Sequence, residues 1–276
     1  MKKAIALILA LVMVFALAAC GNQAAPAAST APAADNGSAA AADGDITQGE
    51  KLNIKWYAVL PDNHPTIMAY ADLFDQIAEE TNGRITFEMT AGGILGTEQE
   101  GFDMVRDGTV QGAMMNTSYY ESYVPNSQGW MMAYTFSGYK QALAYFNSEE
   151  LLDQWNADIA GTNTMALNAV SPGFRCLTSN KAVYTPADAA GLNIRSMESP
   201  MSQSYVSILG GNPVPLAWAE VYMGLSTGSI AGQENPIAHI QSYNLFEVQK
   251  YLSFTEHALV LSWSIFNTEF WNSLSA

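Results

Sequence analysis

The order of secondary-structure signals from residue 51 onward limits the fold more than any other feature of this sequence. Alternating apolar residues and helix-capping residues predict strands at 52–58, 85–89 and 110–115, with one helix between each pair. Pro65 stands in the first turn of the first helix, and the capping box Thr97-Glu98-Gln99-Glu100 opens the second. This alternation predicts a mostly parallel α/β sheet with helices on both faces, whose ligand lies beyond the carboxyl ends of the strands.

The second half of the chain repeats the alternation. Its signals predict helical structure at 139–161, a strand at 164–170, a crossing between lobes at 171–175 and a strand ending at Arg195. They then predict a helix opened by Ser199-Pro200, a helix at 217–225 and a strand at 230–235. One Glu and two Gly residues also recur 120 positions later in the same spacing. They are Glu100, Gly108 and Gly112, followed by Glu220, Gly228 and Gly232. The recurrence indicates two similar lobes, each pushing a strand end into a shared cleft.

Residues 1–20 have the pattern of a lipoprotein signal peptide. Lys2 and Lys3 precede a short apolar stretch, which ends in Leu17-Ala18-Ala19-Cys20. This ending looks like a lipobox, in which Cys20 becomes the lipid-modified first residue of the mature chain. Residues 21–50 are rich in Ala, Pro and Ser and predict a disordered linker. We therefore expect an extracytoplasmic domain tethered to the membrane by its lipid.

Composition excludes several classes of function. The formal net charge is −15, so no basic surface is available for a nucleic-acid partner. CxxC and HExxH spacings are absent and the three histidines are scattered, so we expect no metal and no cofactor. A G-x-S-x-G elbow is also absent, which argues against a secreted hydrolase, and we expect no enzyme.

The segment Gly191–Arg195, taken together with Gln233–Pro236, is the candidate functional region. A short apolar run ends in one arginine, which predicts a buried strand that delivers a cation to its end. A buried guanidinium keeps its charge and needs an anionic partner, which is a carboxylate or phosphate ligand if the protein supplies none. A structural ion pair with a protein Asp or Glu is the alternative.

Several separated motifs resemble those of the DctP-type solute-binding proteins of tripartite ATP-independent periplasmic (TRAP) transporters. The motifs are Arg175–Lys181, Gly191–Arg195, Gly210–Pro215, Glu220–Tyr222, Gly232–Pro236 and Glu247–Leu252. The resemblance covers roughly residues 51–276. It implies a two-lobed periplasmic-binding-protein-like α/β fold, with lobe I at 51–172, to which 261–276 return, and lobe II at 173–260. The C-terminal helical part of the family is missing beyond a helix start at 266–271, so we expect a truncated sequence.

The resemblance also assigns site residues. It implies that Arg195 binds the substrate carboxylate at two points and that Arg175 adds a second cationic contact. It also implies that Asn235 donates a hydrogen bond to the ligand and that Trp218 packs on the ligand. On the first lobe, the positions that face the cleft are Glu98, Asn116 and Tyr119. Simpler roles stay open for three of these residues: core packing for Trp218, turn capping for Asn235 and helix-end charge for Glu98.

The expected function is therefore capture of a small organic acid and its delivery to a TRAP permease of one small and one large subunit. No P-loop occurs in this chain, so an ion gradient would supply the energy. We expect a monomer anchored through Cys20. A lipoprotein sensor that feeds a signalling kinase is the alternative, and the motif order disfavours the binding protein of an ATP-driven importer. The sequence does not name the acid.

Overall fold

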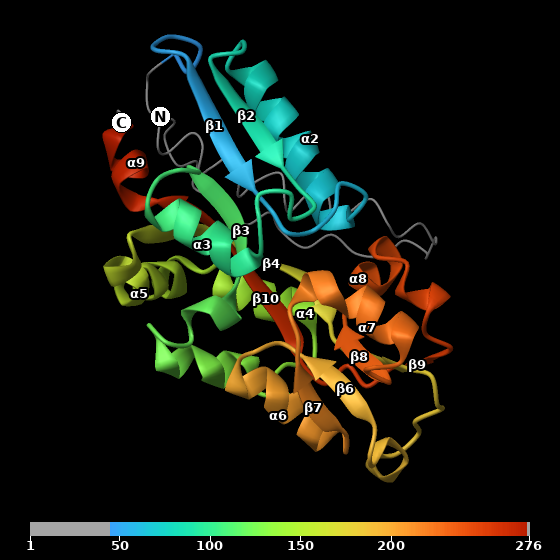
Figure 1. The fold of residues 1–276 in the computed structure, drawn as a ribbon. Helices are drawn as coiled ribbons and strands as arrows, with labels where there is room; N and C mark the ends of the chain where they lie inside the picture. Colours follow the sequence, from blue (N-terminus) through green and yellow to red (C-terminus); the bar gives the residue numbers. More distant parts are fainter. Residues whose placement is uncertain (1–44, 275–276) are drawn as a thin grey trace, which may run out of the picture.

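The computed structural model describes residues 45–274. The predicted signal peptide, the lipidation site Cys20 and linker residues 21–44 lie outside this range. Within it, no helix is both long and apolar enough to cross a bilayer, and no group of three or more His, Cys, Asp or Glu residues is placed to hold a metal ion. The chain forms two lobes, one above the other in Figure 1, each built on a five-stranded sheet.

The first lobe is a mixed sheet with helices on both faces, as the sequence predicts. Its strands follow the order β2 (Ile85–Thr90), β1 (Leu52–Tyr57), β3 (Gly112–Asn116), β10 (Leu259–Asn267) and β4 (Thr164–Phe174). Strands β2, β1 and β3 are parallel, whereas β10 runs antiparallel to both β3 and β4. One face packs against α3 (Glu98–Arg106), α4 (Tyr139–Phe146) and α5 (Glu149–Ile159), and the other against α2 (Pro65–Glu80) and α9 (Thr268–Ser273).

The second lobe follows the same plan. Its strands lie in the order β7 (Asn212–Pro215), β6 (Asn193–Ser196), β8 (Gly232–Asn235), β5 (Cys176–Ser179) and β9 (Tyr251–Ser253). Strand β6 is parallel to β7 and β8, and β5 is antiparallel to β8 and β9. Its helices are α6 (Pro200–Ile208), α7 (Val221–Thr227) and α8 (Ile237–Ser242). Short 3-10 helices complete the chain at η1 (Thr117–Tyr120), η2 (Pro125–Met131), η3 (Ala160–Thr162), η4 (Pro186–Ala189), η5 (Trp218–Glu220) and η6 (Leu245–Glu247).

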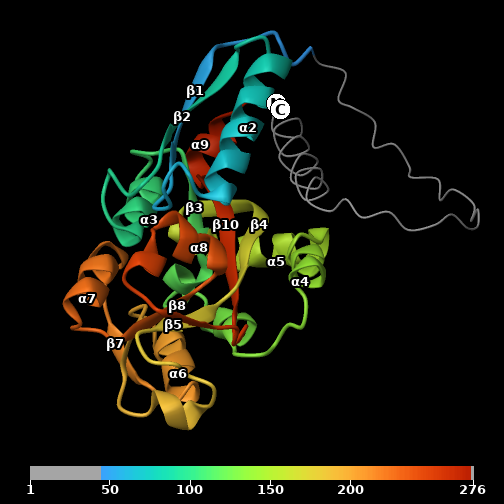
Figure 2. The same ribbon diagram turned by 90° about the vertical axis from the view of Figure 1, so that its right-hand side faces the viewer.

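Two neighbouring segments join the lobes. Strands β4 and β10 pair along the first lobe up to Leu259 and Phe174, and Arg175 N donates to Ala258 O over 2.8 Å just beyond that pair. Figure 2 shows β10 running down from the upper lobe toward the strands of the lower one. The strand β4 continues through most of the predicted crossing at 171–175, so the chain changes lobes within one or two residues of Arg175.

The recurrence at 120 positions is confirmed as a structural repeat. Gly108 and Gly228 each end a helix in the left-handed region, with φ of +80° and +77°. Gly112 and Gly232 then begin β3 and β8, and both lie against neighbouring atoms where a side chain has no room. Glycine meets both demands, since it tolerates positive φ and allows close approach of strands.

The helical structure predicted at 139–161 is confirmed, and it is divided into α4 and α5 because Ser148 starts a new helix by accepting the backbone N–H of Leu151 over 3.4 Å. Another prediction is wrong in detail. The helix start predicted at 266–271 begins only at Thr268, where the Asn267 side chain caps α9. The residues before it form β10, which is buried along its whole length and which the sequence analysis did not predict.

We expect Gly112→Ala to lower the free energy of unfolding by about 1–3 kcal/mol, because the new methyl would overpack the core. An ideal Cβ at this position would lie 2.5 Å from the Trp56 ring and 2.9 Å from Ile265 O. Urea denaturation measures the loss. The control Gly161→Ala has nothing within 4 Å of its added Cβ and should stay within about 0.5 kcal/mol of wild type. Equal stability of the two variants would contradict the packing described here.

Candidate functional site

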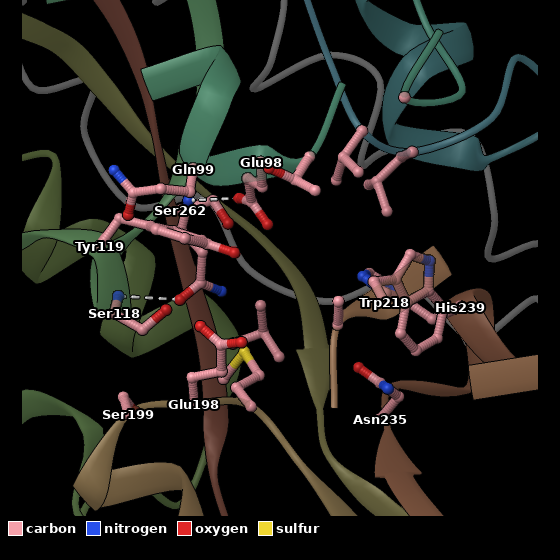
Figure 3. A pocket seen from close by; sticks show the side chains of 18 of the residues that line it. Glu98, Gln99, Ser118, Tyr119, Glu198, Ser199, Trp218, Asn235, His239 and Ser262 are labelled. Carbon is pink, nitrogen blue, oxygen red and sulfur yellow. Dashed lines mark hydrogen bonds between the residues drawn. The ribbon is translucent and has the colours of Figure 1, made fainter. Parts of the chain in front are cut away.

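A cavity of about 880 Å³ lies between the lobes, within the size range of small-molecule sites. All seven residues proposed from the sequence line it, and they come from both lobes. They are Glu98, Asn116, Tyr119, Arg175, Arg195, Trp218 and Asn235. Figure 3 shows Glu98 and Tyr119 on one side of this cavity and Trp218 with Asn235 on the other.

The guanidinium of Arg195 is buried and has no carboxylate partner. Arg195 lies on β6 and is only 4% exposed. Its Nε donates to Leu216 O over 2.9 Å, and its central carbon lies 5.3 Å from the centre of the Trp218 ring. None of the salt bridges among residues 45–274 includes it. Burial, followed by the nearby charge of Arg175, lowers the pKa of Arg195 to about 10, so it stays cationic at neutral pH.

The second arginine of the cavity wall, Arg175, already has an internal counter-ion. Its Nε forms an ion pair with Glu234, and its Nη2 donates to Glu234 Oε1 over 3.0 Å and to Glu234 O over 2.8 Å. His257 Nε2 lies 3.2 Å from the same carboxylate. Burial alone would raise the pKa of Glu234, but the Arg175 charge and the bonds from His257 and Arg175 lower it to about 2. Arg175 thus lies on the cavity wall with its charge compensated, and no pattern in the sequence predicts this pairing.

Trp218 and Asn235 complete the wall of the second lobe. Trp218 begins η5, and its ring meets Tyr243 at 4.7 Å and His239 at 6.2 Å between centres. Asn235 ends β8 and is 3% exposed. One N–H of its amide donates to Gln233 Oε1 over 2.7 Å, which fixes the amide plane. The other amide atoms have no hydrogen-bond partner among the described residues.

The first lobe contributes a carboxyl and a phenol. Glu98 is the first residue of α3, and its Oε1 accepts the backbone N–H of Asn116 over 2.9 Å. Burial raises the pKa of Glu98 to about 7, although the Asn116 hydrogen bond and the charges of Arg195 and Arg175 act in the opposite direction. Burial also raises the pKa of Tyr119. The Asn116 side chain accepts the backbone N–H of Ser118 and caps η1.

Equivalent positions of the two lobes carry different chemistry. In the strand register, Tyr57 on β1 is the partner of Ala113, and Arg195 on β6 is the partner of Gln233, which lies 120 positions after Ala113. Tyr57 donates through its hydroxyl to Gly96 O over 2.7 Å. Arg195 donates through Nε to Leu216 O, the carbonyl 120 positions later. The shared backbone plan thus places a neutral phenol in one lobe and a cation in the other.

The cavity wall also includes residues that were not predicted from the sequence, among them Glu121, His239 and Tyr243. Glu121 is 7% exposed, and burial raises its pKa although the nearby Ser199 hydroxyl acts in the opposite direction. His239 was discounted as one of three scattered histidines, because its neighbours in space are distant in sequence. No sequence pattern singles out these side chains.

The family follows from the match of residues 57–276 to a family model described as bacterial extracellular solute-binding protein, family 7, or DctP. The chain belongs to this family. The resemblance stated from the sequence is therefore confirmed, as is its two-lobed α/β fold. The family's description is that of bacterial extracellular solute-binding proteins.

Several curated proteins are similar to this family 7 chain. One is the 2,3-diketo-L-gulonate-binding periplasmic protein YiaO of Escherichia coli, which is 34% identical over 185 residues, 67% of this chain and 56% of YiaO. Another is the C4-dicarboxylate-binding periplasmic protein DctP of Vibrio cholerae, 26% identical over 78% of this chain and 64% of that protein. The chain spans less than two thirds of the length of either relative.

Solved structures of TRAP periplasmic solute-binding proteins have the same fold. The protein from Pseudomonas putida F1 with bound D-glucuronate is 27% identical, with a TM-score of 0.75 over 81% of this chain and 73% of that one. The sugar acid binding protein of Advenella mimigardefordensis, in complex with galactonate, has a TM-score of 0.77 over 82% of this chain and 73% of its own. At 23% identity the latter supports the fold alone.

We expect Glu98→Gln to flatten part of the pH dependence of stability. Folded Glu98 keeps its proton up to about pH 7, whereas the unfolded chain releases it near 4.5. Between these values the folded state binds more protons, so the free energy of unfolding falls as pH rises. The variant should lose this fall, on the order of 1–3 kcal/mol between pH 5 and pH 8. Urea denaturation at both pH values measures it.

The matched control is Glu150→Gln, which removes an exposed carboxyl at the start of α5. It should keep the wild-type pH profile. A Glu98→Gln variant whose profile coincides with that of wild type would show that the buried carboxyl titrates normally.

Proposed function

We propose that this protein is a lipid-anchored solute-binding protein that captures a small organic acid and delivers it to a TRAP-type permease driven by an ion gradient. The observation that carries the proposal is the buried guanidinium of Arg195, which faces the cavity without a carboxylate partner. A bound carboxylate would supply the missing counter-ion through a two-point fork.

Electrostatics favours an acid over a neutral solute. Removing a cation from water is costly unless an anion accompanies it, and Coulomb attraction strengthens as water leaves the site. The pairing of Arg175 with Glu234 leaves Arg195 as the uncompensated cation of the cavity wall in the described chain. We therefore assign the carboxylate to Arg195, with Asn235 beside it as a donor and Trp218 as the packing surface. The charge of Arg175 lowers the pKa of Arg195, and the charge of its partner Glu234 acts in the opposite direction.

The first lobe would close the site over the rest of the ligand. Glu98, Asn116 and Tyr119 line the same cavity from the opposite lobe, so a ligand bound there touches both lobes. Contacts with both lobes stabilise the closed arrangement relative to an open one. Closure expels water and strengthens the bonds to the carboxylate.

The printed ligands of the relatives support an acid as cargo. YiaO is named for 2,3-diketo-L-gulonate, and related structures hold D-glucuronate and succinate. Ectoine-binding relatives also occur, at 28% identity. The lipid anchor at Cys20, a monomeric state and a two-subunit permease partner rest on the sequence motifs and on the family, and they belong to the proposal.

We expect Arg195→Ala to weaken binding of the captured acid by about 2–5 kcal/mol, which is thirtyfold or more, because the ligand carboxylate would lose its buried partner. A thermal-shift screen with D-glucuronate, D-gluconate, succinate and 2,3-diketo-L-gulonate identifies the binding acids, since a ligand of the native state raises the melting temperature. Calorimetry then measures the affinity of each variant.

The control is Arg106→Ala, which removes a half-exposed arginine away from the cavity. It should bind like wild type. An Arg195→Ala variant that folds and keeps the wild-type affinity for the same acid would refute the assignment of the carboxylate site. A failure of every acid to bind wild type would refute the proposed function itself.

A further inference from the structure

Two of the three histidines meet where α8 of the second lobe packs against the first lobe. His64 caps the start of α2 and is fully buried. The backbone N–H of Thr66 donates to His64 Nδ1 over 3.1 Å. A backbone N–H can only donate, so His64 Nδ1 must carry a lone pair. In neutral His64 the proton therefore lies on Nε2.

The second ring receives that proton as a hydrogen bond. His64 Nε2 lies 3.1 Å from His239 Nδ1, and the two rings meet edge to face with centres 4.8 Å apart. Because His64 Nε2 is the donor, His239 Nδ1 is the acceptor, and neutral His239 carries its own proton on Nε2. Burial lowers the pKa of His64 to about 4. Burial first, and then the charges of His64, Arg175 and Arg195, lower the pKa of His239 well below 6.5, so both rings are neutral at pH 7.

The remaining nitrogen of His239 is available to the cavity. His239 lines the cavity, and its Nε2 has no hydrogen-bond partner among residues 45–274. His239 is only partly buried, so its side chain keeps some accessible surface. Figure 3 places His239 next to Trp218, above Asn235. Arg195 and His239 both lie next to Trp218. The central guanidinium carbon of Arg195 is 5.3 Å from the centre of the Trp218 ring, and the centre of the His239 ring is 6.2 Å from it.

We propose that His239 is a ligand-binding residue of the cavity that presents an Nε2–H donor, and that His64 is the positioning residue that fixes this tautomer. The inference rests on the proposed function and narrows the class of ligand. Arg195 and His239 both lie next to the Trp218 ring and line the same cavity. A ligand whose carboxylate lies on Arg195 and whose body packs on Trp218 would therefore bring its far end to His239. The donor there selects acids that carry a second oxygen acceptor, such as a keto, hydroxyl or carboxylate group, over acids with a plain alkyl tail.

The first test reads the tautomers by NMR in the absence of ligand. Only three histidines occur in the chain, at positions 64, 239 and 257, so ¹⁵N-histidine labelling gives three rings that single variants assign. We expect Nε2–H tautomers for His64 and His239 at pH 7. We also expect a signal from the His64 Hε2 proton that is protected from exchange with solvent. The variant His239→Phe should abolish this signal, because it removes the nitrogen that accepts the hydrogen bond. We call the hydrogen bond from His64 Nε2 to His239 Nδ1, which fixes the tautomer of His239, the relay. An Nδ1–H tautomer of His239, or a His64 signal unchanged in His239→Phe, would overturn it.

The variant His64→Asn separates the relay from the helix cap. Asn is a good N-cap residue and keeps the acceptor for the first turn of α2, but it removes the ring that donates to His239. The fold should persist, and His239 should show a mixture of tautomers. A single Nε2–H tautomer that is as well protected as in wild type would show that His64 does not fix it.

The second test compares matched acids by calorimetry. The pairs are 4-oxopentanoate with pentanoate and 5-oxohexanoate with hexanoate, which differ in one carbonyl oxygen. Wild type should prefer at least one keto acid by about two- to tenfold, the range of one neutral hydrogen bond. His239→Phe should lose the preference, and His239→Gln, which retains an N–H donor, should keep part of it.

The outcomes separate the two proposals. Equal preference in wild type and His239→Phe would overturn the role of His239 while Arg195 still governs affinity. Loss of binding of both members of each pair in Arg195→Ala supports the proposed function regardless of His239. Binding of no acid to wild type would remove the ligand-binding role of His239 together with the proposed function, and the NMR signals would then decide the relay alone.

Discussion

The proposed function depends on one charge, the guanidinium of Arg195, which has no carboxylate partner among residues 45–274. The chain contains a ready comparison in Arg175, which is equally buried and is paired through two nitrogens with Glu234. A buried charge that is paired and hydrogen-bonded is tolerated, and one without a partner is costly. Within residues 45–274, the partners of Arg195 are a backbone carbonyl and an aromatic face, which stabilise a cation without neutralising it. The charge that the protein leaves unbalanced is the charge that a visiting acid can balance.

The duplicated architecture explains how this charge reaches the cavity. Each lobe brings a helix, a left-handed glycine and a strand to the same place, and the carboxyl ends of the parallel strands face the space between the lobes. The equivalent positions Tyr57 and Arg195 hydrogen-bond to equivalent carbonyls, so the backbone geometry is shared and only the side chains differ. The cation therefore lies on one wall, and Glu98, whose pKa is raised to about 7 by burial, lies on the other. In the proposed complex, this asymmetry would orient a ligand that carries one acidic end.

Local patterns in the sequence predicted the parts of the fold that depend on local interactions. The capping box at Thr97–Glu100, the glycine stops and the apolar run before Arg195 all correspond to observed elements, because capping and strand burial are decided within a few residues. The seven site residues proposed from the family motifs all line one cavity. Strand β10 was not predicted, because its place between β3 and β4 depends on pairing with segments that are distant in the sequence.

Pairings between distant segments could not be read from the sequence. Glu234 neutralises Arg175 across 59 positions, and only the antiparallel register of β5 and β8 brings them together. His64 and His239 are 175 positions apart and meet because α8 returns to the first lobe, where Tyr243 also donates to Val59 O. The two arginines thus looked alike in sequence and differ in structure for a reason that lies entirely in tertiary contacts.

The most direct measurement of the central claim is a crystal structure of the protein with bound D-glucuronate. The account predicts the ligand carboxylate on Arg195, with both oxygens about 3 Å from guanidinium nitrogens, while Arg175 remains paired with Glu234. A carboxylate held by Arg175, with Glu234 displaced and Arg195 turned away from the ligand, would contradict it.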